Sequence, residues 1–299
     1  MTYTPSDFAL DKNGPQFAWL DERLTVHGFP SIRLLDPPKD RVQRFQLAQG
    51  WRGTGADGLI GPKTLLRLMD DPKPTTPPPS GIDLTDWKLT LPTDATDDGK
   101  ADEIKQPTLA NFSFAPYFYR RADGGQAFRA DCDGATTSSN TSYPRSELRE
   151  MTNNGKDLAK WDTDDGVIRT LDVELAFTHL PEIKPHVVGI QIHDGSDDVT
   201  TLRLEGTDLW VTKGDKKYKK IATGVGPTDR LKVKYEASGA GIRWFLNGDH
   251  VATIDGTYTD CFAKAGCYTQ ASSRVPKTSD KYGTGYGEVV IYALTKEAA

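Results

Sequence analysis

The octapeptide Tyr143–Glu150, YPRSELRE, is short and charged, and it contains no run of apolar residues. Arg145, Glu147 and Arg149 occupy every second position within it. Because alternate side chains of an extended strand point to the same face, these three side chains form one charged row. Such a row predicts a sheet with a polar face that can hold an extended polar ligand.

Residues 186–195, HVVGIQIHDG, show the same alternation. Gln191 and His193 fall on one face of the expected strand, where they add an amide and an imidazole to the polar surface. On the opposite face we expect three apolar side chains, those of Val188, Ile190 and Ile192.

A third stretch with a polar face covers residues 261–270, CFAKAGCYTQ. Lys264, Tyr268 and Gln270 are separated by even numbers of residues, so an extended strand presents them together. Three strands that each carry a polar row can line one groove. We expect that groove to be the functional site.

Short alternating segments broken by Gly, Asp, Asn and Pro fill the chain from Gly81 onward. Asn247-Gly248, between two such segments, is a strong signal of a β-hairpin. Many short strands with turns at regular intervals are typical of an antiparallel sandwich. The sequence therefore predicts a mainly β protein with a β-jelly-roll sandwich domain.

The N-terminal region differs, because its apolar residues recur at helical spacing. The pattern V-x-x-F-Q…D-G-x-x-G-P-x-T, which starts at Val42, resembles the small three-helix peptidoglycan-binding-like domain often joined to polysaccharide enzymes. Pro62 stands where the first residue of a helix is expected. The resemblance implies binding to cell-wall polysaccharide, and a packing module without a ligand is the alternative.

Five prolines within residues 72–80 predict a semi-rigid, extended linker. This linker marks a domain boundary. We therefore expect a helical domain at residues 1–71, the linker at 72–80 and the sandwich domain at 81–299.

The composition is that of a soluble globular protein, with 26% charged and 36% hydrophobic residues. The apolar runs are too short for a transmembrane helix, and the N-terminus shows no signal peptide. The net charge of −5 gives no general attraction for nucleic acid. Three cysteines permit one disulfide in three pairings, and we expect one bridge in a secreted, monomeric protein. The three are Cys132, Cys261 and Cys267.

The three polar stretches also carry a family resemblance. R-S-E-L-R at 145–149, Q-I-H at 191–193 and the stretch at 261–270 resemble, in the same order, the three motifs of polysaccharide lyase family 7, the alginate lyases. The likeness spans roughly residues 81–295, since GIDLTDWKLTLP resembles the start of that domain. It implies a β-jelly roll with an open cleft for a polysaccharide.

The third stretch departs from the family pattern Y-F-K-A-G-x-Y-x-Q. Cys261 stands near the usual tyrosine, and Ala263 is an extra residue before Lys264. The K-A-G-x-Y-x-Q core is intact, so the difference falls on the segment that leads into the strand.

Cleavage of a 4-linked uronate by β-elimination removes the proton at C5, next to a carboxylate. That proton is weakly acidic while the carboxylate keeps its full negative charge. Hydrogen-bond donors aimed at the carboxylate stabilise the enolate-like dianion that forms, as in an oxyanion hole. Arg145 and Gln191, with His193 nearby, can supply such donors. A base must also take the C5 proton, and an acid must protonate the departing O4.

The resemblance implies that Tyr268 is the acid, and also the base for mannuronate, where both groups leave from one face. It implies that His193 is the base for guluronate, where they lie on opposite faces. Tyrosine has an ordinary pKa of about 10, so a cation such as Arg145 or Lys264 must favour its phenolate if it acts as base. Four residues are implied to hold neighbouring sugars: Glu147, Arg149, Lys264 and Gln270. The scheme requires no metal or other cofactor.

We therefore expect an endolytic alginate lyase that releases oligosaccharides with a 4,5-unsaturated non-reducing end. Ile192 of Q-I-H favours guluronate-containing blocks by family tendency. A lyase for another polyuronate, such as glucuronan, is the alternative within the same chemistry. A non-catalytic carbohydrate-binding protein is the alternative from another class, although a binder has no need for a tyrosine beside a histidine. Glycoside hydrolysis ranks behind these because Glu147 has no clear carboxylate partner.

Overall fold

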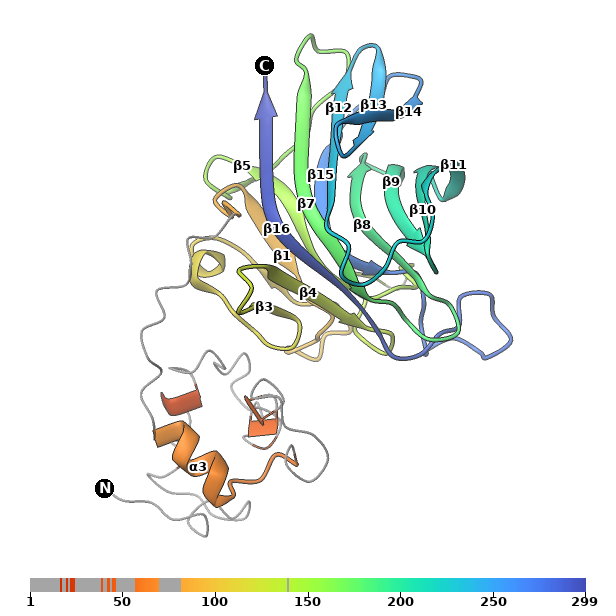
Figure 1. Cartoon of the computed structure of the whole chain (residues 1–299). Coiled ribbons are helices and arrows are strands. Elements are labelled where there is room, and N and C mark those ends of the chain that lie inside the picture. Colours follow the sequence, from red (N-terminus) through yellow and green to blue (C-terminus); the bar gives the residue numbers. More distant parts are fainter. Residues whose placement is uncertain are drawn as a thin grey trace. The chain divides into compact units, whose positions relative to one another are not determined.

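The computed structural model describes residues 57–69, 82–138 and 140–299, together with positions 17, 20, 22–24, 39, 42, 43, 45 and 46. The chain divides into two compact units (Figure 1). One comprises Met1–Pro78 and Phe112–Tyr119, and the other comprises Pro79–Asn111 and Arg120–Ala299. The expected linker, residues 72–80, lies outside the described residues. Within the described ranges, no helix combines the length and the apolar character needed to cross a membrane.

The described part of the first unit is organised around helix α3, Pro62–Met69. The helix begins at Pro62 as expected, since a residue in the first turn needs no amide hydrogen. Leu65 and Leu68 are buried in a small apolar core. The same core contains Leu20, Leu24, Val42, Phe45 and Ile60. The three-helix architecture stays a prediction, because much of the chain before α3 lies outside the described residues.

The Gln46 amide joins α3 to the turn before it. Its Oε1 accepts from the Gly58 amide at 2.8 Å, and its Nε2 donates to the Leu59 carbonyl at 2.8 Å and to the Thr64 hydroxyl at 3.0 Å. Gly58 has a φ of 76°, and a Cβ there would lie 2.5 Å from the Lys39 carbonyl oxygen. The Q, D-G and T of the sequence pattern are thus parts of one hydrogen-bonded corner.

The second unit is a sandwich of two antiparallel sheets, as the sequence predicts. In the described chain, the first sheet has nine strands and is called here the site sheet. Its order is β11 (Lys216–Ala222), β10 (Asp208–Lys213), β9 (Asp198–Glu205), β8 (His186–His193), β15 (Phe262–Thr269), β5 (Arg145–Thr152), β1 (Trp87–Thr90) and β2 (Glu103–Ile104), with β6 (Asp157–Leu158) paired to β5.

The second sheet, called here the back sheet, has seven strands within the described residues. Its order is β14 (Asp249–Ile254), β13 (Gly241–Leu246), β12 (Leu231–Ser238), β7 (Arg169–His179), β16 (Tyr286–Ala298), β4 (Gln126–Asp131) and β3 (Phe118–Arg120). A short 3₁₀ helix, η3 (Thr108–Asn111), follows β2. The predicted hairpin at Asn247-Gly248 is confirmed, since these residues join β13 to β14 with φ values of 52° and 95°.

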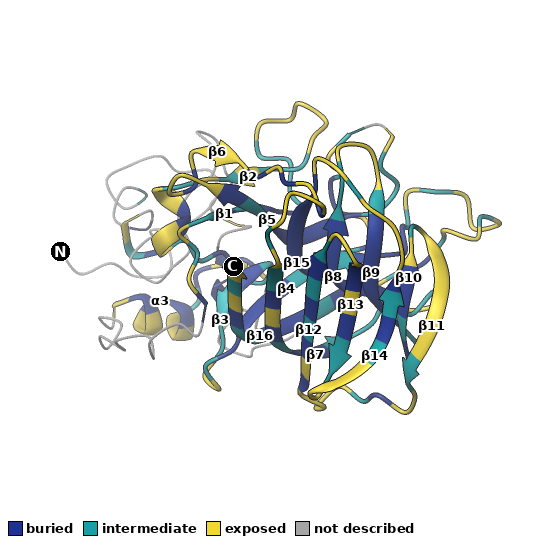
Figure 2. Cartoon of the chain, turned by 90° about the horizontal axis from the view of Figure 1, so that it is seen from above, coloured by how far each residue is buried: buried dark blue, intermediate teal, exposed yellow. Residues whose placement is uncertain are grey.

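Both sheets carry many buried residues (Figure 2), and large aromatic side chains are among the most deeply buried. Trp244 is 0% exposed, and its ring meets that of Tyr235 edge to face with centroids 5.6 Å apart. The Trp244 Nε1 donates to the Thr200 hydroxyl at 3.1 Å, so this hydrogen bond links β13 to β9 across the sandwich. Burial of each such side chain contributes about 1.5–3 kcal/mol to folding. This core fixes the site sheet from behind.

The expectation of a disulfide is wrong, because all three cysteines are free and buried. Cys267 lies on β15 and Cys261 just precedes it, so roughly 20 Å of extended chain separates the two. The Cys132 thiol donates instead to the Thr284 carbonyl at 3.4 Å. Burial raises the pKa of the Cys132 and Cys261 thiols to about 12, which keeps both thiols protonated.

Candidate active site

Three adjacent strands carry the three sequence motifs, because β15 lies between β5 and β8. Lys264 on β15 is the register partner of Arg149 on β5 and of Gln191 on β8. His193, at the end of β8, is the register partner of Phe262. Partners in an antiparallel pair point to the same face, so the predicted polar face is assembled by this register.

Regular alternation along β15 places Tyr268 on that face, where it pairs with Arg145 of β5, and a β-bulge brings Val188 beside it. The β15–β8 register shifts between Ala265 and Tyr268, so that Tyr268 pairs with Val188 and not with Val187. Val188 therefore lies beside Tyr268 on the polar face. The prediction that Val188 shares the apolar face with Ile190 is wrong. Gly266 lies within the shifted segment with a φ of 147°. A Cβ at Gly266 would lie 2.6 Å from a backbone oxygen of β5, so the close approach of these strands requires glycine.

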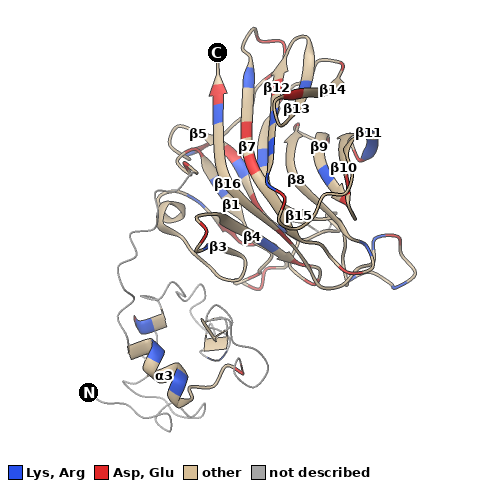
Figure 3. Ribbon diagram, in the orientation of Figure 1, with Lys and Arg blue, Asp and Glu red and all other residues tan. Residues whose placement is uncertain are grey.

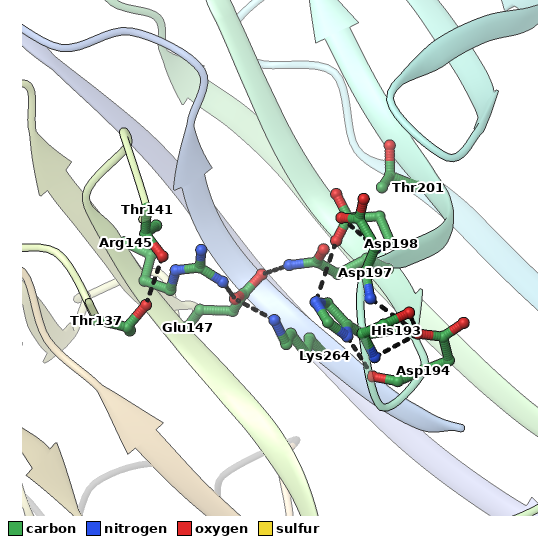
Figure 4. Close-up of polar contacts among 12 residues, drawn as sticks. Thr137, Thr141, Arg145, Glu147, His193, Asp194, Asp197, Asp198, Thr201 and Lys264 are labelled. Carbon is green, nitrogen blue, oxygen red and sulfur yellow. Dashed lines mark hydrogen bonds and ion pairs between the residues drawn. The ribbon is translucent and has the colours of Figure 1, made fainter. Parts of the chain in front are cut away.

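The Glu147 carboxylate is the common acceptor of the site (Figure 4). Glu147 is 2% exposed. It accepts a hydrogen bond from Arg145 Nη1 at 3.1 Å and another from Gln191 Nε2, and Lys264 Nζ lies 3.9 Å away. Two cations compensate the buried charge, as a buried carboxylate requires. Three donors are thereby held on one face of the sheet.

The Gln191 side chain has a donor and an acceptor that are not used within the described part of the protein. One Nε2 hydrogen is directed at Glu147, and a carboxamide nitrogen carries a second. The Gln191 Oε1 atom is buried and has no partner within the described structure. Both features are compatible with a polar ligand that completes the contacts of this amide.

Tyr268 is held as a neutral phenol. Burial raises its pKa to about 12, and the nearby Arg145 guanidinium opposes that rise. The guanidinium carbon lies 3.7 Å from the centre of the Tyr268 ring. The expected cation is therefore in place, but desolvation outweighs it, so the side chain carries its proton at neutral pH.

His193 is held as a neutral imidazole with a defined tautomer. Its Nδ1 lies 2.6 Å from the Asp194 carbonyl oxygen, which can only accept a hydrogen bond, so Nδ1 carries the hydrogen. The lone pair is then on Nε2. Burial, assisted by the positive charge of Lys264, lowers the pKa of His193 below its ordinary value of 6.5. A neutral imidazole with an open Nε2 has the form of a general base.

Two residues of this face were not predicted from the sequence. Asp198 on β9 is the register partner of His193, and its Oδ1 lies 3.7 Å from His193 Nε2. Burial raises the pKa of Asp198 to about 6. The Phe262 ring stacks on His193 with centroids 5.1 Å apart, and the Arg149 guanidinium carbon lies 3.9 Å from its centre. Phe262 is two residues before Lys264, so strand alternation could have predicted that both lie on this face. The position of Asp198 depends on the register of the β8–β9 hairpin, which the sequence does not show.

Arg149 and Gln270 lie further from the Glu147 cluster. Arg149 Nη1 donates to the Glu150 carbonyl at 3.1 Å and Nη2 to the Ala159 carbonyl at 3.4 Å. Gln270 follows the last residue of β15, and its Nε2 donates to the Thr269 carbonyl at 3.2 Å. Arg149 still belongs to the site through Phe262, while the sugar-binding role of Gln270 stays a prediction.

The β8–β9 hairpin also gathers potential metal ligands. His193, Asp197 and Asp198 offer ligand atoms that all lie within 4.8 Å of one another. A divalent ion bound there would occupy the His193 lone pair. Metal binding at this cluster and general-base chemistry by His193 are therefore mutually exclusive.

A jelly-roll sandwich with these donors, a neutral histidine and a protonated tyrosine on one sheet has the groups that a polysaccharide lyase needs. The family model described as alginate lyase matches residues 82–298, and the chain therefore belongs to this family. The confirmed resemblance covers the sandwich domain, and the helical N-terminal part lies outside the match.

Two solved structures support the assignment. The alginate lyase AlgAT5 from polysaccharide lyase family 7 is 41% identical, with a TM-score of 0.66 over 72% of this chain and 95% of that one. An alginate lyase from Corynebacterium sp. is 44% identical, with a TM-score of 0.67 over 73% of this chain and 96% of that one. A curated alginate lyase from Klebsiella pneumoniae is 43% identical over 93 residues, which is 30% of each protein.

Proposed function

We propose that this chain cleaves alginate by β-elimination. The observation that supports it is the clustering of Arg145, Gln191 and Lys264 around Glu147, on the same face as a protonated Tyr268 and a neutral His193. A protein that only binds carbohydrate needs the donors but has no use for an acid and a base in complementary protonation states. The second candidate within the same chemistry is a lyase for glucuronan.

The donors act on the carboxylate of the sugar that loses its C5 proton. Arg145 and the second Nε2 hydrogen of Gln191 bind this group and stabilise the additional negative charge that develops on it. His193 Nε2 takes the C5 proton as the C5–H bond breaks. The electron pair forms the C4=C5 double bond, the C4–O4 bond breaks, and the Tyr268 hydroxyl gives its proton to O4. The products are a 4,5-unsaturated non-reducing end and a new reducing end.

Guluronate-containing blocks are the proposed preference. The base and the acid reside on different strands, which suits a substrate whose C5 proton and O4 lie on opposite faces. Ile192 pairs with Ala263 and is 0% exposed, so it affects the substrate only through its neighbours Gln191 and His193. Endolytic action is proposed because β15 lies inside the site sheet, with strands on both sides to support a continuous polymer.

The test is the ultraviolet absorbance of the double bond conjugated to the carboxylate, with polyguluronate, polymannuronate and glucuronan as parallel substrates. We expect a rise on the alginate blocks, faster on polyguluronate. A rise on glucuronan alone would keep the mechanism and replace the substrate. No rise on any polymer that still binds would overturn the lyase proposal in favour of a binding protein.

We further propose that the protein acts outside the cell, because a polymeric substrate is encountered there. The helical unit is proposed to bind cell-wall polysaccharide. Retention of the full chain on insoluble peptidoglycan, compared with a chain that starts at the linker, tests this role. Equal retention of both would favour the packing module.

A further inference from the structure

We propose that the site sheet carries a distal subsite, formed by Trp210, Lys217 and Lys220, that binds a carboxylate of the same polyuronate several sugars from the cleaved bond. The inference rests on the proposed function for the identity of its ligand. It concerns the strands β9, β10 and β11, which the three sequence motifs do not reach.

One cross-strand row connects the acid to this subsite. Tyr268 pairs with Val188, Val188 with Arg203, Arg203 with Trp210, and Trp210 with Lys220. Because register partners share a face, all five side chains lie on the face of the catalytic cluster. Neighbouring strands are about 4.8 Å apart, so Trp210 lies about 14 Å from Tyr268 along the row. A polymer that follows this row passes over Trp210 after several sugars.

Two ammonium groups are held on the Trp210 indole. Lys217 Nζ lies 4.9 Å and Lys220 Nζ 5.2 Å from the ring centre. Both side chains come from β11, the exposed edge strand of the sheet (Figures 2 and 3). The aromatic ring provides a flat surface on which one face of a sugar can pack. The two ammonium groups provide hydrogen-bond donors for a carboxylate.

The carboxylates of Glu205 and Asp208 lie beside Trp210 and limit how strongly the two lysines can bind a ligand. Lys217 pairs with Glu205 and Lys220 with Asp208, each at 2.6 Å, and Glu205 also accepts from Arg203 at 2.8 Å. Arg203, Lys217 and Lys220 carry three positive charges and the two carboxylates carry two negative charges, so the group has a net charge of +1. A ligand carboxylate must compete with Glu205 and Asp208 for the two lysines. The subsite therefore contributes a modest affinity that decreases with added salt.

Among the described residues, the face that carries this row also concentrates buried polar atoms without a hydrogen-bond partner. Five buried side-chain polar atoms lack a partner in the described part of the chain, and four of them belong to residues of this face. They are Arg145 Nε, Gln191 Oε1, Arg203 Nε and Trp210 Nε1. Buried polar groups are normally satisfied, so the concentration marks this face as one that a polar ligand completes.

Tyr143 and Lys184 add an aromatic and a basic side chain beside the Tyr268 end of the row. Tyr143 lies against Tyr268 with ring centroids 6.1 Å apart, and its hydroxyl accepts from Lys184 Nζ at 3.1 Å. Burial lowers the pKa of Lys184. These two side chains extend the polar and aromatic surface beside the acid, as a uronate chain requires.

The test compares two double variants on β11. Lys217→Ala/Lys220→Ala removes the platform cations. Lys216→Ala/Lys219→Ala removes the same charge from the opposite face of the strand, since Lys219 pairs with Val211, which is 0% exposed and packs in the core. Each protein is assayed on a long alginate and on a trisaccharide, which places at most two sugars on one side of the cleaved bond and does not reach Trp210.

We expect Lys217→Ala/Lys220→Ala to raise KM for the long polymer roughly three- to tenfold, the size that one or two partly exposed charged contacts carry. Its kcat/KM on the trisaccharide should equal that of the wild type, and the control pair should leave the kinetic constants on both substrates unchanged. Equal effects of the two double variants, or equal effects on both substrates, would overturn the subsite.

Failure of the proposed function would be seen separately, as no turnover by the wild type. In that event, affinity electrophoresis in an alginate-containing gel still decides the subsite. Weaker retardation of Lys217→Ala/Lys220→Ala than of the control pair supports it, and equal retardation of the two overturns it.

Discussion

The Arg145 guanidinium lies over the Tyr268 ring, with its central carbon 3.7 Å from the ring centre. The same guanidinium donates to Glu147 at 3.1 Å, so one cation connects the acid to the common acceptor of the site. It opposes the effect of burial, which raises the pKa of Tyr268 to about 12. Tyr268 therefore keeps its proton until O4 departs, and the cation then stabilises the phenolate that is left.

Replacement of Tyr268 by phenylalanine removes the acid and leaves a ring beneath Arg145. We expect kcat for Tyr268→Phe to fall by about 10²–10⁴-fold, the usual contribution of a positioned acid or base. Polymer binding should persist, because the donors around Glu147 are unchanged. Absorbance of the unsaturated product measures turnover, and affinity electrophoresis measures binding.

Tyr258→Phe is the matched control for this substitution. The Tyr258 hydroxyl donates to the Asp255 carbonyl at 3.0 Å and touches none of the site residues. Its loss should leave kcat unchanged. Near-normal turnover by Tyr268→Phe would remove Tyr268 from the mechanism.

The alkaline limit of activity is expected to follow Lys264. Burial, with Arg145 beside it, lowers the pKa of Lys264 to about 8. Its positive charge is therefore lost as the pH rises through about 8, whereas an ordinary lysine keeps it to about 10. We expect kcat/KM to fall near pH 8, and Lys264→Arg to move this fall to higher pH because arginine stays charged.

The acidic limit supplies the internal control in the same pH–rate profile. The pKa of His193 lies below its ordinary value of 6.5, so protonation inactivates the base only below that pH. Lys264→Arg should leave an acidic limb in that range. An alkaline limb at the same pH in both proteins would assign it to a group other than Lys264.

Asp198 is expected to make stability depend on pH. Burial raises its pKa to about 6 from an ordinary value of 3.8, so the folded protein binds this proton more tightly than the unfolded chain does. The resulting stabilisation is present below about pH 4 and is lost as the pH rises through 6. By linkage, the loss is at most about 3 kcal/mol.

Asp198→Asn removes this titration. In urea unfolding at about pH 4 and about pH 7, the free energy of unfolding of the variant should improve relative to wild type at the higher pH. Other ionisable groups titrate in both proteins and cancel in the difference. Parallel pH profiles of the two proteins would contradict the assigned role of Asp198.

The Glu150 carboxylate accommodates the extra residue before Lys264. It accepts from the Ala263 amide and from Trp161 Nε1, both at 2.9 Å, and from Lys296 Nζ at 3.3 Å. We expect Glu150→Ala to lower the free energy of unfolding by about 2–3 kcal/mol, because two buried N–H groups lose their acceptor. Lys296→Met keeps both of those bonds and should cost less. Equal losses in denaturant titrations would attribute the effect to the ion pair.

Strand periodicity predicted much of the site from the sequence. Arg145, Glu147 and Lys264 share a face because each strand alternates regularly over those residues, and β5 pairs with β15 without a shift. Asn247-Gly248 predicted its hairpin because that turn requires positive φ at both residues. Strand alternation and turn preferences are therefore sufficient to predict the site where the strands pair without a register shift.

Pairing between strands accounts for what the sequence did not show. Val188 changes face because the β8 and β15 registers shift, and a shift depends on the neighbouring strand. Asp198 joins the site through its pairing with His193 across a hairpin. The disulfide was expected from the number of cysteines, whereas the distance along an extended strand keeps Cys261 and Cys267 apart.

β15 is hydrogen-bonded along both of its edges, to β5 and to β8. A strand held in this way exchanges its amide hydrogens slowly and cannot be displaced without opening two ladders. Among the described strands, β2 and β11 lie at the margins of the sheet and each has one neighbour. Adaptation to another uronate polymer is therefore easiest at those margins, where residues can be exchanged without disturbing the machinery at the centre.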